Sequence, residues 1–400
     1  MLTSLALIFL VGTLFGYAFS RLRLPGILGM LITGILLGPF ALNRIDGTIL
    51  SISAEVRQLA LIIILARAGF SLNLDDLKKV GRPAILMCFV PACFEIAGIV
   101  LLAPIILNIS VLEAAIMGTV VAAVSPAVIV PRMLKLMDGG YGTAKGIPQL
   151  IMAGASVDDV FVIVLFSSFT ALANGGELSL LRLFQIPFSI LLGVIAGALA
   201  GLLLPVIYKR FHVRDSSKMI VLIGFSCLLV AAENLLAQTL PFSGLLAVMS
   251  IGITMLKFYP ALAERMSARL SKLWVPAEIL LFVLVGATVD VSYAASAGGK
   301  TGLLLGLALI FRMAGVLLCM LRTRTNWRER AFCMVAYIPK ATVQAAIGGI
   351  PLAMGLPCGN TVLTVAVLSI LITAPIGAFG VDLLYTRCLS KENDERVTHS

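Results

Sequence analysis

The stretch Ile151-Met-Ala-Gly-Ala-Ser-Val-Asp-Asp-Val-Phe-Val-Ile-Val-Leu-Phe166 places two adjacent carboxylic acids, Asp158 and Asp159, in the middle of an apolar segment. A charged side chain at bilayer depth costs about 3 kcal/mol or more. Two neighbouring carboxylates cost more, because like charges repel in a low dielectric. We therefore expect this pair to bind a cation or a proton. A structural cap or a salt bridge is the alternative interpretation.

The composition around this pair is that of a membrane protein. Hydrophobic residues make up 60% of the chain and charged residues 12%, whereas soluble domains average about 25% charged residues. Apolar runs as long as a bilayer-crossing helix recur from end to end. We predict an all-α polytopic membrane protein, with one membrane domain over residues 1–400. About 13 transmembrane helices are expected at roughly 2–19, 25–41, 56–71, 82–104, 111–131, 146–172, 183–208, 217–236, 242–258, 273–292, 300–321, 331–354 and 358–385.

The net charge of +10 could indicate a nucleic-acid partner, but the distribution of the basic residues argues against one. Of the 30 Lys and Arg residues, 20 lie in the loops after the odd-numbered predicted helices and three near the C-terminus. The loops after the even-numbered helices hold three, namely Arg44, Arg182 and Lys300. By the positive-inside rule, this asymmetry predicts an N-terminus outside and a short polar C-terminal tail, after Arg387, in the cytoplasm. Membrane lipid is the expected surrounding.

Hydropathy repeats in two halves of six helices, with the segment 183–208 between them. Segment 111–131 is interrupted at Ser125-Pro126, and its counterpart 331–354 is interrupted at Pro339 and again near Pro351. An odd linker helix inverts the second half relative to the first. Paired broken helices at matching positions point to the midplane site of a transporter, although any single proline is also explained by a packing kink.

The aspartate pair is predicted to be the ion site. Neighbouring residues on a helix point about 100° apart, so one carboxyl group can line a cavity while the other turns toward a neighbouring helix. Burial and mutual repulsion favour the protonated form, and a metal cation competes with the proton for the same carboxylate. Hard oxygen ligands suit Na⁺ or Li⁺ by the logic of other hard cations. Backbone carbonyls near Val124 and Ser125, at the break before Pro126, are candidate supporting ligands.

Three further charges lie inside apolar segments: Glu95, Arg312 and Lys340. Arg312 is effectively always charged and needs a partner. We expect Glu95, which occupies the matching position of the repeat, with Asp158 or Asp159 as the alternative. A purely structural salt bridge remains an alternative role for Glu95 with Arg312. Lys340 lies at the second break, where a buried lysine requires a carboxylate.

Several classes of function fit poorly. His212 and His399 both lie outside the apolar segments, so no intramembrane histidine relay is available, and there is no phosphate-binding glycine motif for ATP. An intramembrane aspartyl protease needs two facing carboxyl groups, whereas adjacent aspartates on one helix diverge. A passive channel or an ion-coupled symporter remains open.

The motifs around these residues resemble those of a known family. The stretch Ala123-Val-Ser-Pro-Ala-Val-Ile-Val-Pro131 and the stretch Ser156-Val-Asp-Asp159 are similar to monovalent cation:proton antiporters of the NHA type, the bacterial relatives of the mammalian NHA sodium/hydrogen exchangers. Further similar motifs are Gly139-Gly-Tyr-Gly142, Lys145-Gly-Ile-Pro148, Pro339-Lys-Ala-Thr-Val-Gln-Ala345, Phe311-Arg312, Leu24-Pro-Gly-Ile-Leu-Gly29 and Gly34-Ile-Leu-Leu-Gly-Pro39. The resemblance covers nearly the whole chain.

The resemblance implies an NhaA-like fold with two inverted six-helix repeats and crossed broken helices. It implies a homodimer in a bacterial cytoplasmic (inner) membrane, in which an ion-translocating core, approximately 82–172 and 300–386, slides past a dimerisation part, approximately 1–71 and 183–292. Asp158 and Asp159 would carry Na⁺ or Li⁺ and H⁺, while Arg312 and Lys340 would neutralise the core. No cofactor and no soluble regulatory domain are expected. A potassium/proton antiporter is the alternative activity.

Overall fold

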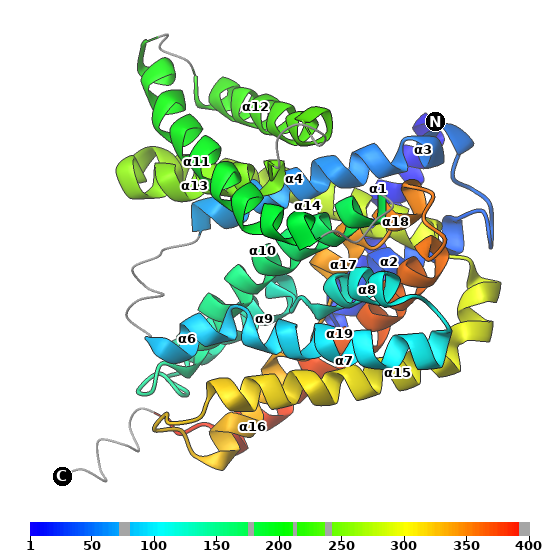
Figure 1. The fold of residues 1–400 in the computed structure, drawn as a ribbon, viewed down its shortest axis with the longest axis vertical. Helices are drawn as coiled ribbons and strands as arrows, with labels where there is room; N and C mark the ends of the chain where they lie inside the picture. The colour runs from blue at the N-terminus through cyan, green and yellow to red at the C-terminus, as the bar shows by residue number, and fades with distance from the viewer. Residues whose placement is uncertain (72–80, 175–179, 211–213, 237–241, 392–400) are drawn as a thin grey trace. The chain divides into compact units, whose positions relative to one another are not determined.

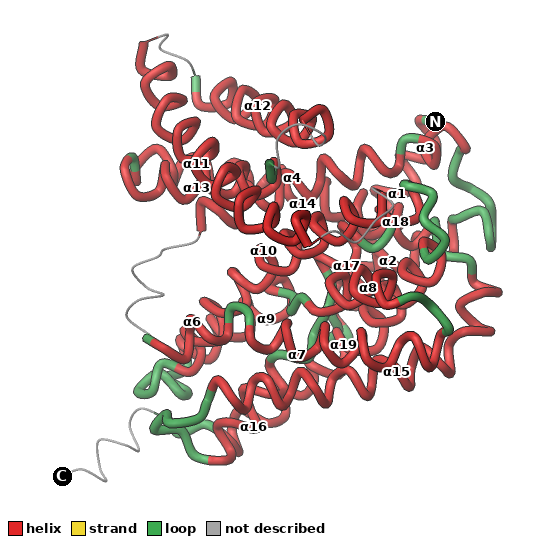
Figure 2. Tube along the Cα trace, in the orientation of Figure 1, coloured by secondary structure: helices red, strands yellow, loops and turns green. Residues whose placement is uncertain are grey.

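The computed structural model describes residues 1–71, 81–174, 180–210, 214–236 and 242–391, which form helices and loops without a named strand (Figure 2). The chain divides into two compact units. Unit 1 comprises Met1–Ser51, Leu74–Ile163 and Phe282–Ser400, and unit 2 comprises Ile52–Asn73 and Val164–Leu281. His212, His399 and the predicted tail beyond residue 391 lie outside the described residues.

Unit 1 holds most of the helices. Helix α7 packs along α15 and against α8, and α7 and α15 run side by side in Figure 1. Helix α19 packs against α8, α16 and α18. The helices of unit 1 are α1 (Leu2–Arg21), α2 (Gly26–Leu37), α3 (Gly47–Ser51), α6 (Arg82–Met87), α7 (Val90–Leu107), α8 (Val111–Ala122), α9 (Pro126–Asp138), α15 (Val291–Cys319), α16 (Trp327–Ala336), α17 (Thr342–Ile347), α18 (Ile350–Ala353) and α19 (Gly359–Cys388), together with the first part of α10 (Ile147–Asn174) and the end of α14 (Pro260–Ala287).

Unit 2 is built around α13 (Gly244–Phe258), which packs against α4 (Ser53–Ser71), α11 (Leu180–Arg210) and α12 (Asp215–Leu236). Its close packing depends on small residues. A Cβ added at Gly197 would fall within 2.6 Å of the Ser250 side chain of α13, so α11 can approach α13 this closely only without a side chain there.

The two predicted interruptions occur where the prolines lie. Helix α8 ends at Ala122 and α9 begins at Pro126, whose missing N–H suits the first position of a helix. Helix α16 ends at Ala336 and α17 begins at Thr342. The backbone N–H of Ser125 donates to the carbonyl of Pro339 at 2.8 Å, so the two interruptions contact each other directly. A Cβ at Gly377 in α19 would overlap the Pro339 ring, so this position packs closely against the second interruption.

Within the described residues, nine helices are long and apolar enough to cross a membrane. Every one of the predicted segments falls on one helix or on two or three consecutive helices, which confirms the all-helical polytopic class. The count of about 13 crossings stays a prediction, because several of these helices are short.

More than one predicted boundary is wrong. The segment expected at 300–321 begins earlier, in α15 at Val291, so Lys300 lies on a helix and not in a loop. The segment expected at 273–292 is part of α14, which begins at Pro260. The basic residues Arg265, Arg269 and Lys272, expected in a loop, therefore lie on a helix. Buried apolar residues at helical spacing, Ala263, Met266, Leu270 and Trp274, extend the packed face of α14 through this basic stretch.

Candidate functional site

Asp158 is fully buried in unit 1 and is held by two donors from other elements. Its Oδ2 atom accepts a hydrogen bond from the backbone N–H of Val124 at 2.9 Å and one from Arg312 Nη2 at 3.0 Å. The Val124 N–H is available because α8 ends at Ala122, two residues earlier. The Oδ1 atom has no hydrogen-bond partner among the described residues. One oxygen of this carboxyl group is thus anchored, and the other is buried without a protein donor among the described residues.

Arg312, on α15, is the centre of the network and is fully buried. Its Nη1 atom donates to Glu95 Oε2 at 2.7 Å and also to the carbonyl of Ala122. Its Nε atom donates to the carbonyl of Tyr337 at 2.8 Å. The guanidinium group therefore pairs with both of the partners considered from the sequence, Glu95 and Asp158, and it also supplies donors to carbonyls beside both helix interruptions.

Lys340 lies in the second interruption, where its side chain is fully buried. Its Nζ atom donates to Glu95 Oε2 at 2.8 Å, so the carboxylate that a buried lysine requires is Glu95. Its backbone N–H donates to Thr373 Oγ1 of α19 at 3.0 Å. Glu95 therefore serves two basic residues, Arg312 and Lys340, from two different elements.

Asp159 differs from its neighbour. Its side chain is half-buried, and in the described part of the chain no hydrogen bond or ion pair holds it. The two aspartates diverge as expected for neighbours on a helix. Counting Glu95, Asp158 and Asp159 against Arg312 and Lys340, the cluster contains one more carboxyl group than basic groups. Such a cluster is able to take up one proton or one monovalent cation.

Neutral oxygen atoms also lie at the first interruption, beside Val124, whose N–H donates to Asp158. Ser125 is buried, and its hydroxyl has no partner among the described residues. Its neighbour Pro126 begins α9, which leaves the Ala122 carbonyl without its usual helical donor. The described residues contain no group of three or more His, Cys, Asp or Glu arranged to hold a metal ion. An alkali cation at Asp158 and Asp159 would therefore need neutral oxygens for its remaining ligands.

Two polar residues of this network escaped the sequence reasoning. Gln344, on α17, is fully buried and donates to the carbonyls of Val121 and Ala123 at 3.1 and 2.8 Å. Tyr337 supplies the carbonyl that binds Arg312 Nε. The available signal for Gln344 was an amide inside an otherwise apolar segment, which is a buried polar group that requires partners.

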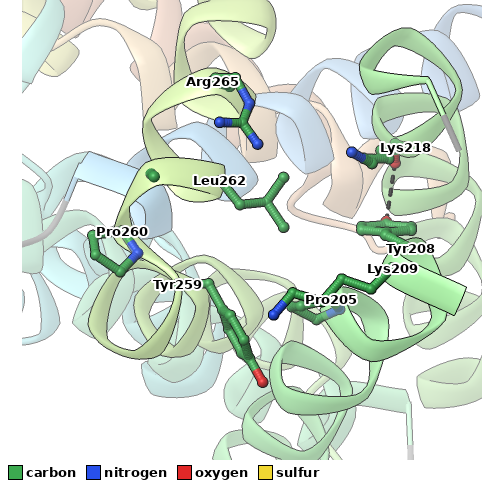
Figure 3. A pocket seen from close by; sticks show the side chains of 9 residues that line it. Pro205, Tyr208, Lys209, Lys218, Tyr259, Pro260, Leu262 and Arg265 are labelled. Carbon is green, nitrogen blue, oxygen red and sulfur yellow. Dashed lines mark hydrogen bonds between the residues drawn. The ribbon is translucent and has the colours of Figure 1, made fainter. Parts of the chain in front are cut away.

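Unit 2 contains a pocket of about 730 Å³ whose lining includes Lys209, Lys218 and Arg265 (Figure 3). Lys218 and Arg265 pair with Asp215 at 2.8 and 3.2 Å, and the Lys209 ammonium lies 5.4 Å from the ring centre of Tyr259. The basic side chains outnumber Asp215, the carboxylate that pairs with two of them, so this lining disfavours an alkali ion. The three carboxyl groups described above, Glu95, Asp158 and Asp159, lie in unit 1.

Comparison with known proteins places the chain in a family. The family model "Sodium/hydrogen exchanger, transmembrane" matches residues 5–385. The chain is 33% identical to mouse sodium/hydrogen exchanger 9B2 over 92% of this chain and 69% of the relative. It is 31% identical to human sodium/hydrogen exchanger 9B1 over 93% of this chain and 74% of the relative.

A solved structure shares the fold. The sodium proton antiporter MjNhaP1 from Methanocaldococcus jannaschii superposes with a TM-score of 0.74 at 20% identity, over 96% of this chain and 94% of that one. The family resemblance drawn from the sequence motifs is therefore confirmed. This chain belongs to the sodium/hydrogen exchanger family, and it is an integral membrane transporter rather than an enzyme.

Proposed function

We propose that this chain is a secondary active antiporter that exchanges Na⁺ or Li⁺ for H⁺ by alternating access. The observation that carries the proposal is the carboxyl group in excess of basic partners, Asp159 beside Asp158, in an otherwise matched buried cluster. A proton and an alkali ion compete for the same carboxylate oxygens. Occupancy by one excludes the other, and this exclusion couples the two fluxes.

The site residues supply the other requirements of such a mechanism. Arg312 and Lys340 offset most of the negative charge of the cluster. The open atom Asp158 Oδ1 and the unpartnered hydroxyl of Ser125 are oxygen ligands of the kind that hard cations prefer. Binding of either ion would therefore bring the cluster to electrical balance, which is the condition for crossing an apolar barrier.

The movement that we propose is elevator-like. A core over approximately 82–172 and 300–386, which contains every residue of the site, would slide against a scaffold over approximately 1–71 and 183–292. The scaffold would also form a homodimer. In this proposal the chain has two inverted six-helix repeats with crossed broken helices. The direct hydrogen bond between the two interruptions supports the crossing.

The proposed location is a bacterial cytoplasmic membrane, with the N-terminus outside and the C-terminus in the cytoplasm. The excess of Lys and Arg in alternate loops supports this orientation. Cysteine-accessibility labelling from each side of intact and everted membranes would test it. Labelling of a cysteine placed at the N-terminus from the cytoplasmic side would contradict it.

The function is tested by ΔpH-coupled exchange in everted vesicles with Na⁺, Li⁺ and K⁺ in turn. Asp158→Asn and Asp159→Asn, each alone, are expected to abolish exchange, because each removes a titrating group that the cargo occupies. Asp382→Asn is the matched control, since Asp382 pairs with Arg132 at a partly exposed position of the same unit. Intact exchange in both site variants would defeat the assignment. Exchange with K⁺ alone would establish the potassium/proton alternative.

A further inference from the structure

One peptide group lies between the two broken helices and carries a contact on each side. The carbonyl of Ala123 accepts a hydrogen bond from Gln344 Nε2 at 2.8 Å. The N–H of the same peptide group, which belongs to Val124, donates to Asp158 Oδ2 at 2.9 Å. In a trans peptide the C=O and the N–H point in opposite directions and rotate as one rigid plane. Gln344 and Asp158 therefore bind opposite sides of a single group.

The orientation of the Gln344 amide is determined by its partners. Its nitrogen donates to two carbonyl oxygens, those of Val121 and Ala123, and a carbonyl cannot donate in return. The Oε1 atom of the amide is buried and has no partner among the described residues. The side chain is fully buried, so no solvent contact supports another orientation.

The two carbonyls need an outside donor because of the interruption. Inside a helix, the carbonyl of Val121 would accept from the N–H of Ser125, four residues later. That N–H is instead committed to the carbonyl of Pro339. The Gln344 side chain therefore replaces helical donors that the break removes, and it does so from the other broken helix.

From these contacts we propose that Gln344 is a positioning residue for the ion site. It holds the Ala123–Val124 peptide group with its N–H directed at Asp158, and thereby fixes the orientation of the Asp158 carboxyl group. The hydrogen bond from Gln344 to the peptide group and the one from the peptide group to Asp158 polarise each other, and this strengthens both. The effect of Gln344 on cation binding rests on the proposed function. The hydrogen bonds that link Gln344 to Asp158 do not depend on it.

Without the Gln344 donor, the peptide group can rotate its N–H away from Asp158. Arg312 would then be the remaining donor to this carboxyl group among the described residues. A site loses binding energy when its ligands are less well oriented. Loss of one ordinary hydrogen bond changes an equilibrium about fivefold, and we expect the change in cation binding to be of that size.

The test compares Gln344→Met, which keeps the side-chain length and removes both donors, with Ser369→Ala. Ser369 is equally buried, but its hydroxyl bonds locally to the Ala366 carbonyl at 2.6 Å within α19. For Gln344→Met in proteoliposomes, the apparent KM for Na⁺ should rise about fivefold, with the rate at saturating Na⁺ changed less than about twofold. Ser369→Ala should leave the KM unchanged. An unchanged KM in Gln344→Met would overturn the proposal. If that variant fails to fold, Gln344→Asn, which is too short to reach both carbonyls, replaces it.

A second measurement does not depend on transport. The loss of thermal stability from Gln344→Met is compared in the native background and in Asp158→Asn, using the purified full chain. Charge-assisted hydrogen bonds are about twice as strong as neutral ones, so the part of the loss that passes through the Val124–Asp158 bond should be smaller when Asp158 is neutralised. If Gln344→Met costs the same stability in the native background and in Asp158→Asn, the proposal is overturned. Absence of any exchange by the unaltered protein would instead overturn the proposed function and leave this cycle standing.

Discussion

Replacing Glu95 by Gln and Arg312 by Gln, singly and together, is expected to give losses of stability that do not add. The two side chains contact each other at 2.7 Å with no solvent exposure. Removing one partner of a buried ion pair leaves an uncompensated charge and costs about 3–5 kcal/mol. Removing both leaves no charge of this pair behind, so the second substitution should cost less than the first.

The other contacts of Glu95 and Arg312 affect the expected losses of stability. Arg312 keeps Asp158 when Glu95 is replaced, and Glu95 keeps Lys340 when Arg312 is replaced. Glu95→Gln, however, also leaves Lys340 without its carboxylate partner among the described residues, and Arg312→Gln leaves Asp158 without its basic partner. Each single substitution should therefore cost about 3–5 kcal/mol. Contacting residues in one network show interaction energies of about 0.5–3 kcal/mol, and a direct buried pair belongs in the upper part of that range. We expect the double variant to lose about 2–3 kcal/mol less than the sum of the two single losses.

The measurement is the free energy of unfolding in mixed micelles with increasing sodium dodecyl sulfate, for the four proteins of the cycle. A parallel cycle with Arg132→Gln and Asp382→Asn provides the control, because that pair is 3.3 Å apart and partly exposed. Exposed pairs contribute about 0–1 kcal/mol, so the coupling there should be small. Additivity within about 0.5 kcal/mol at Glu95 and Arg312 would refute the contact between them.

Two further predictions concern packing and charge in the same unit. Gly154→Ala places a methyl group against the buried hydroxyl of Tyr337 and should cost about 1–3 kcal/mol by overpacking, measured by the same titration. Gly306→Ala, whose new methyl would meet no other element within 4 Å, should be neutral or slightly stabilising, and equal effects of the two substitutions would contradict the packing. Asp158→Asn should destabilise the protein, because its basic partner stays buried. Asp159→Asn should be neutral or stabilising, because it removes an unpaired charge. A thermal shift of the same sign and size in both variants would contradict the difference between the two aspartates in the structure.

Much of the architecture was predictable because its causes are local. A proline removes a backbone donor wherever it occurs, so the positions of the two interruptions follow from Pro126 and Pro339 directly. A carboxyl pair in an apolar segment is conspicuous because its burial is so unfavourable. The N-terminal part of α14 was not predicted as helix, because its basic residues lower the hydropathy of the segment. Its apolar residues form a face only when they are read at helical spacing.

The pairing within the site was not predictable to the same degree, because the partners are distant in sequence. Arg312 contacts Asp158 across 154 positions, and Lys340 contacts Glu95 across 245. The sequence offered Glu95 or an aspartate as alternatives for Arg312, whereas the guanidinium group has enough donors to bind both. Gln344 was not predicted as a site residue, because burying a neutral amide costs less than burying a charge and so gives a weaker signal in the sequence.

The arrangement of charges joins transport to stability in this protein. All three carboxyl groups come from residues before 174, and both basic groups come from residues after 290. The attraction between them therefore holds the two halves of unit 1 together at the proposed ion site. A substitution at Arg312 changes both properties, so loss of exchange alone does not reveal a residue's role. Asp159 is different, since no ion pair among the described residues depends on it. Loss of exchange with stability retained is thus the pattern that separates a cargo-binding carboxyl group from one that holds the fold.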